Sequence, residues 1–131
     1  MKYFTISELT RSDTALRLGI DNTPDESVVA ALEALVRNIL DPPREAWGRP
    51  ITVTSGYRCP QLNRAVGGVS NSQHLSGYAA DISTGDRVLN RRLFQLVQDL
   101  KLPFDQLIDE KNFAWIHVSY AMVPRRQVLK L

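Results

Sequence analysis

The stretch that decides the fold is residues 72–83, SQHLSGYAADIS, where a polar loop runs into a short apolar segment. From Tyr78 the side chains alternate, so Ala80 and Ile82 point to one side of a strand and Asp81 points to the other. The pattern predicts a strand with one face in the core and an acidic group on the opposite face.

A second alternating stretch, residues 115–120 (WIHVSY), has the same character. Ile116 and Val118 are expected in the core, so His117 faces a cleft or solvent. Because Thr, Val and Ile favour strands, two further strands are predicted. They span residues 51–54 and 104–110, the latter ending in a turn at Lys111-Asn112.

Two long amphipathic helices are predicted from apolar residues that recur at helical spacing. The first opens with Thr23-Pro24-Asp25-Glu26, interpreted as a capping box with Pro at the first helical position, and stops at Pro42-Pro43. Asp86 is expected to cap the second. A short helix over 60–66, a loop over 67–73 and a solvated tail carrying Arg125, Arg126 and Lys130 complete the chain.

These elements predict a single α+β domain over residues 1–131, with helices packed on one face of a small, mostly antiparallel sheet. With 44% hydrophobic and 23% charged residues the chain is globular in composition. A net charge of +2 is too small for a nucleic-acid stripe or a polybasic membrane surface. The lone Cys59 excludes an internal disulfide, and no apolar run is long enough to insert in a membrane.

The two histidines of the chain, His74 and His117, together with Asp81, suggest a catalytic zinc site. Two imidazoles and a carboxylate that project from scaffold edges leave a fourth position for water. Spacing alone leaves other interpretations open. A strand histidine can simply be packed, and Asp81 can serve in a turn or an ion pair.

The residues of the two motifs resemble those of the zinc D-Ala-D-Ala peptidases of peptidase family M15, which have the hedgehog/DD-peptidase fold. The pattern SxHxxGxAxD is matched over 72–81 and WxHxS over 115–119. The resemblance extends to residues 55–58, 62–68 and 106–110, and spans about residues 20 to 120.

This resemblance implies roles for individual residues. His74, Asp81 and His117 would bind Zn²⁺, and Arg58 would hold a substrate carboxylate or carbonyl with its forked donors. The other substrate-binding residues expected at the pocket are Ser72, Gln73 and Ser119. The implied activity is zinc-dependent hydrolysis of peptidoglycan stem peptides, by a carboxypeptidase or an endolysin-type endopeptidase.

The catalytic base is expected to be Glu110, although here the chain departs from many relatives. They place an acid three positions before the final histidine, where this chain has Ala114. Glu110 shares a strand face with Ile108, whereas Asp109 points the other way, and hedgehog-type relatives carry a glutamate at this strand end. A surface glutamate paired loosely with Lys111 is the alternative.

A rival hypothesis is a non-catalytic zinc-containing binding domain of the same fold, and a weaker one is a metal-free structural domain. The expected partner is peptidoglycan or its peptide precursors, bound by a monomer. Because residues 1–13 lack the apolar region of a signal peptide, the chain is expected to be cytoplasmic as synthesised and to act on the wall after release or export.

Overall fold

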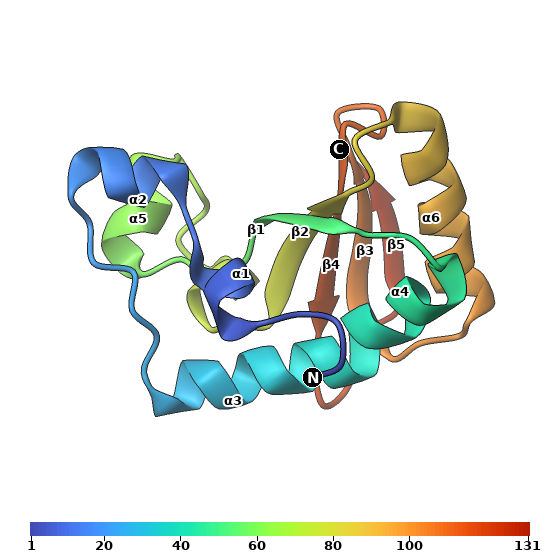
Figure 1. Ribbon diagram of the computed structural model, residues 1–131, viewed down its shortest axis with the longest axis horizontal. Coiled ribbons are helices and arrows are strands. Elements are labelled where there is room, and N and C mark those ends of the chain that lie inside the picture. The colour runs from blue at the N-terminus through green and yellow to red at the C-terminus, as the bar shows by residue number, and fades with distance from the viewer.

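The computed structural model describes residues 1–131, and its centre is a five-stranded sheet (Figure 1). The strands are β1 (Thr52–Ser55), β2 (Ala79–Ser83), β3 (Phe104–Glu110), β4 (Trp115–Tyr120) and β5 (Gln127–Lys130). Their order across the sheet is β1-β2-β4-β3-β5, and only the β3–β5 pair is parallel. The predicted α+β class is confirmed, and the sheet is mixed rather than strictly antiparallel.

The helices fall into two groups (Figure 1). Those packed on one face of the sheet are α3 (Glu26–Leu35), the π-helical turn η1 (Val36–Leu40), α4 (Asp41–Trp47) and α6 (Arg87–Asp99). Those gathered beside the edge strand β1 are α1 (Ile6–Thr10), α2 (Asp13–Leu18), α5 (Pro60–Ala65) and the 3-10 turn η2 (Gln73–Leu75). None of these helices has both the length and the apolar character that a bilayer-spanning helix needs.

The core lies between the sheet and the first group of helices, as the alternation predicted. Ala80 and Ile82 of β2 are buried together with Ile116 and Val118 of β4. The apolar stripes that meet them include Leu32, Leu35 and Ile39 from α3 and η1, and Leu93 and Val97 from α6. Burying these side chains leaves the alternate residues of β2 and β4 on the opposite face of the sheet.

Both ends of the first long helix differ from the prediction. Its N-cap is Asp25, whose carboxylate accepts a hydrogen bond of 2.9 Å from the backbone N–H of Val28, so Pro24 lies outside the helix. Pro42-Pro43 does not stop the helix. These prolines occupy the first turn of α4, where a missing N–H costs little, and η1 joins α3 to α4.

The tail after Tyr120 was predicted to be a solvated end, and the side chains of residues 125–131 are indeed exposed, but the tail is also held to the sheet. Its last residues form β5, which pairs with β3. Before the strand, Arg125 donates to both carboxylate oxygens of the buried Asp105, at 3.0 and 2.7 Å. Arg125 therefore anchors the tail to β3, through a partner that lies 20 residues earlier in the chain.

The second residue after α6, Lys101, offers a test of the backbone. Lys101 has φ of 54°, in the left-handed region that L-residues disfavour at the end of a helix. Lys101→Gly should therefore raise the free energy of unfolding by about 1 kcal/mol. The exposed helix-interior change Arg91→Gly is the matched control and should lower it by about 1 kcal/mol. Urea unfolding of both variants measures the two values, and a loss of stability in Lys101→Gly would contradict the backbone conformation.

Candidate metal centre

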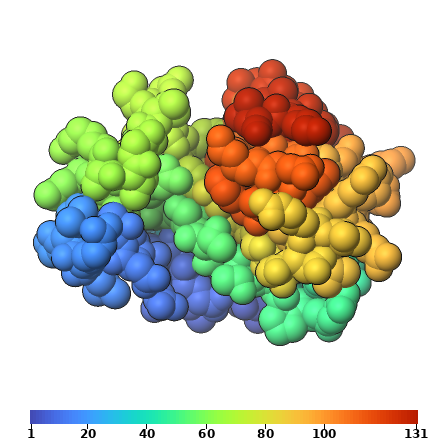
Figure 2. Space-filling model, turned by 90° about the horizontal axis from the view of Figure 1, so that it is seen from above, coloured from blue at the N-terminus to red at the C-terminus, as the bar shows by residue number.

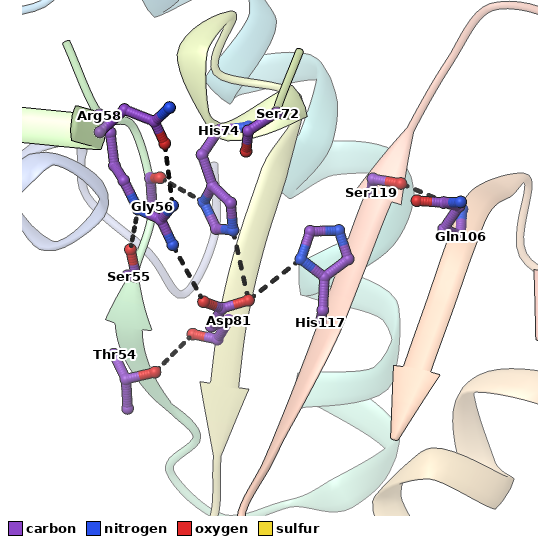
Figure 3. A network of polar contacts seen from close by, with 11 residues as sticks. Thr54, Ser55, Gly56, Arg58, Ser72, His74, Asp81, Gln106, His117 and Ser119 are labelled. Atoms are coloured by element: carbon purple, nitrogen blue, oxygen red, sulfur yellow. Dashed lines mark hydrogen bonds and ion pairs between the residues drawn. The ribbon is translucent and has the colours of Figure 1, made fainter. Parts of the chain in front are cut away.

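The three predicted ligands converge on one side of the sheet (Figure 3). Asp81 on β2 lies directly opposite His117 on β4 in the antiparallel ladder, so both side chains leave the same face. His74 comes from η2. A nitrogen or oxygen atom from each of the three lies within 4.8 Å of the others.

The local sequence explains how the loop places His74 beside Asp81 and His117. The hydroxyl of Ser72 accepts a hydrogen bond from the backbone N–H of His74 at 3.2 Å and caps η2. Gly77 then turns the chain into β2 with φ of 85°, and an added Cβ there would lie 3.0 Å from the carbonyl oxygen of Val28. Glycine is required because this turn is both left-handed and packed against α3.

The hydrogen bonds of His74 favour a cation at this position. Its Nδ1 lies 2.7 Å from the carbonyl oxygen of Gly56, which only accepts, so Nδ1 carries a proton. In the neutral ring Nε2 then has a lone pair, yet it faces Oδ1 of Asp81 at 3.3 Å. Two acceptors that face each other repel, and a cation at Nε2, either a second proton or a metal ion, removes that repulsion.

Distances and burial also fit a metal. Oδ1 of Asp81 lies 3.1 Å from Nδ1 of His117 as well as 3.3 Å from Nε2 of His74. In a tetrahedral zinc site with bonds of about 2.0–2.1 Å, neighbouring ligand atoms are about 3.4 Å apart. Burial raises the pKa of Asp81, but contacts with His117 and His74 outweigh it and hold the pKa well below its usual range. The carboxylate is therefore ionised and ready to bind a cation.

Arg58 borders the ligands in a fixed position. It donates from Nε to the hydroxyl of Ser55 and from a terminal nitrogen to the amide oxygen of Asn63, both at 3.1 Å. Its other terminal nitrogen lies 3.6 Å from Oδ2 of Asp81. Burial lowers the pKa of Arg58, and the charge of Asp81 opposes this shift. The guanidinium is thus oriented by three neighbours before any substrate arrives.

Glu110 lies on the same face as the ligands. Ile108 is directly opposite His117, and Glu110 is opposite Trp115, so Glu110 is a diagonal neighbour of His117. Diagonal neighbours in a sheet are about 7–8 Å apart, within reach of a glutamate side chain. Asp109 points to the other face, where it is buried and accepts a hydrogen bond of 2.6 Å from the backbone N–H of Phe113.

The three predicted substrate-binding polar residues have protein partners. Ser72 caps η2, and the side-chain amide of Gln73 donates to Asp105 at 3.0 Å. Ser119 is fully buried, and its hydroxyl accepts a hydrogen bond of 3.0 Å from the backbone N–H of Gln106. In this structure all three hold the loop and strands that carry the ligands. Their contact with a substrate stays a prediction.

Two residues that position the site were not predicted from the sequence. Asn63 orients Arg58 and also donates to the carbonyl of Val69 at 2.9 Å. Asp105 ties Gln73 to Arg125. Asn63 lies in a segment that already carried the family resemblance, whereas the available signal for Asp105 was an acid directly after the apolar Phe104 at the start of a predicted strand.

Fold and site together define a small α+β protein with one candidate metal centre on the face of its sheet opposite the core helices. The chain belongs to the peptidase M15 family, whose model matches residues 2–119. The donor set of two imidazoles and one carboxylate, in this family, indicates Zn²⁺ as the metal.

A curated relative is the zinc D-Ala-D-Ala carboxypeptidase of Streptomyces albus G. It is 49% identical to this chain over 45 residues. That alignment covers 34% of this chain and 18% of the relative, so the two proteins share a segment rather than their full lengths.

The metal assignment predicts a zinc stoichiometry. Protein purified without chelator should hold about one zinc per chain, and His74→Ala, Asp81→Ala and His117→Ala should each lose it while helical content is retained. Glu110→Gln is the matched control and should keep the metal, because Glu110 lies outside the ligand group. Elemental analysis with circular dichroism measures both, and full zinc occupancy in His117→Ala would refute the ligand set.

The Asp105–Arg125 pair predicts a pH dependence of stability. Hydrogen bonds from Arg125 lower the pKa of Asp105 to about 2. Because the folded-state pKa lies below the unfolded value of about 3.9, the contribution of the pair is complete above about pH 4 and is lost as the pH falls toward 2.

Asp105→Asn should therefore lower the free energy of unfolding at pH 6 by on the order of 1 to 2 kcal/mol, allowing for screening of the exposed Arg125. The difference between wild type and variant should shrink steadily as the pH falls from about 4 toward 2. Urea titrations at each pH provide the values. A difference that is constant over this range would show that Asp105 is not held ionised by Arg125.

Proposed function

We propose that this protein is a zinc-dependent peptidase that hydrolyses peptide bonds in peptidoglycan stem peptides. The observation that carries the proposal is the pair of histidine nitrogens that meet one oxygen of Asp81 on the sheet face opposite the core helices. Membership of the M15 family and the activity for which the Streptomyces relative is named support the reaction class and the substrate.

The residues around the centre suit hydrolysis. A bound zinc ion supplies a water of lowered pKa and a Lewis acid that polarises a carbonyl. Glu110, on the same face as His117, would accept the proton of the attacking water and pass it to the leaving amine. Arg58 would hold a carbonyl or terminal carboxylate of the substrate with donors that its neighbours already orient.

The arrangement favours an enzyme over a non-catalytic zinc domain for one reason. The face that carries the ligands also carries the carboxylate of Glu110, and the guanidinium of Arg58 lies beside Asp81. Asp109 cannot share this role, because its carboxylate is buried on the opposite face and bonded to the backbone of the turn. The absence of an acid at Ala114 is therefore compensated by Glu110 at the end of β3.

The proposal is tested with zinc-loaded protein and synthetic stem peptides that end in D-Ala-D-Ala. Mass spectrometry should detect released D-Ala or shorter fragments, a chelator should stop the release, and added zinc should restore it. Glu110→Gln should retain zinc and lower kcat by about 10²-fold or more.

Asp109→Asn is the matched control in the same strand, and at a temperature where it remains folded its kcat should stay near that of wild type. A zinc-loaded protein that leaves a broad panel of muropeptides intact would support the binding-domain alternative. Near-native turnover in Glu110→Gln together with a large loss in Asp109→Asn would reverse the assignment of the base.

A further inference from the structure

A groove of about 750 Å³ runs along β1, outside the ligand set. One wall is formed by the end of α1 and the start of α2, including Arg11 and Asp13, and the other by residues 50–55 of the chain that leads into β1. Figure 2 shows this part of the chain lying between the lobe of α2 and α5 and the strands of the sheet. Most of the residues that line the groove are polar.

The strand β1, which forms this second wall, has an unpaired edge. β1 is the first strand of the sheet order and pairs only with β2, so the outer backbone groups of Thr52–Ser55 have no strand partner. The edge is closed just beyond the strand, where the N–H of Tyr57 donates to the carbonyl of Leu9 at 2.8 Å. At Gly56 an added Cβ would lie 2.1 Å from that same carbonyl oxygen, so the closure depends on glycine.

The groove is continuous with the metal centre through two residues. Ser55 and Arg58 line it, and both also contact the site: Ser55 pairs with Asp81 across the strands, and Arg58 lies 3.6 Å from the carboxylate of Asp81. A bulge between Val53 and Ser55 bends the edge at this point. Bulges of this kind are found next to active sites, where they redirect a side chain.

The length of the open edge sets the size of the occupant. Four strand residues extend over about 13 Å, which matches about four residues of a peptide laid alongside them. A free dipeptide at the metal would leave most of this edge uncovered. Main-chain pairing with an edge strand is a general way to bind an extended peptide, with side-chain contacts adding specificity.

We propose that the groove beside β1 binds the extended main chain of the substrate as an added strand, so that the enzyme acts on peptides of about four residues or more in preference to a free D-Ala-D-Ala dipeptide. This inference rests on the proposed function and specifies the substrate of the same centre. Ser55 and Arg58 form the junction at which the bound chain passes from the groove to the zinc ligands.

Binding is tested by NMR on zinc-loaded, ¹⁵N-labelled Glu110→Gln, titrated separately with a stem pentapeptide ending in D-Ala-D-Ala and with the free dipeptide. The pentapeptide should shift the amide signals of Thr52–Ser55 together with those near His74 and Asp81. The dipeptide should shift only the second set. Pentapeptide shifts confined to the metal centre would overturn the groove proposal and leave the proposed peptidase function intact.

Turnover is tested with Thr52→Trp, which places a large side chain in the groove without touching a ligand or Arg58. Its ratio of kcat/KM for the pentapeptide to kcat/KM for the dipeptide should fall about tenfold or more. Val128→Trp on β5, at the opposite edge of the sheet, is the matched control and should leave the ratio unchanged.

Equal kcat/KM for the two substrates in wild type, or an unchanged ratio in Thr52→Trp, would refute the groove as a peptide site. Failure of the proposed function looks different: neither peptide would be cut by zinc-loaded wild type, and neither would shift any signal near His74.

Discussion

The structure depends on one carboxylate oxygen, Oδ1 of Asp81, which lies within 3.3 Å of a nitrogen on each histidine. The oxygen is buried and ionised, so its charge needs a cationic partner. Arg58 reaches the other oxygen only at 3.6 Å. A metal ion held by His74, Asp81 and His117 satisfies this requirement, and much of the surrounding hydrogen bonding keeps those three groups in place.

The supporting contacts come from segments distant in sequence. Gly56, just after β1, fixes the ring of His74, while Asp105 on β3 holds the neighbouring Gln73. Asp105 is itself held by Arg125 from the tail. The centre is therefore a junction between three parts of the chain, and its rigidity comes from tertiary contacts rather than from the metal loop alone. Such preorganisation keeps the ligand atoms at distances that a metal ion accepts.

The separation of apolar and polar side chains onto opposite faces of the sheet explains both the core and the site. Period-two alternation in β2 and β4 sends apolar side chains toward α3 and α6, and this burial fixes which face carries Asp81 and His117. A slip of one residue would place both ligands in the apolar core. Register is therefore enforced by the hydrophobic effect, and the metal centre gains its geometry from the packing on the other side of the sheet.

The sequence by itself determined four of the five strands, the face on which Asp81 and His117 lie and the family motifs, because alternation and spacing are local properties. It did not determine the pairing of β5 with β3, the continuous path through Pro42-Pro43, or the partners of Asn63, Asp105 and Arg125. The β5–β3 pairing and the Asp105–Arg125 pair depend on residues brought together from far along the chain, whereas the partners of Asn63 lie only five and six residues away and meet it only once the loop is folded. The groove beside β1 could not be predicted from the sequence either, because β1 is an edge strand only through the strand order of the folded sheet.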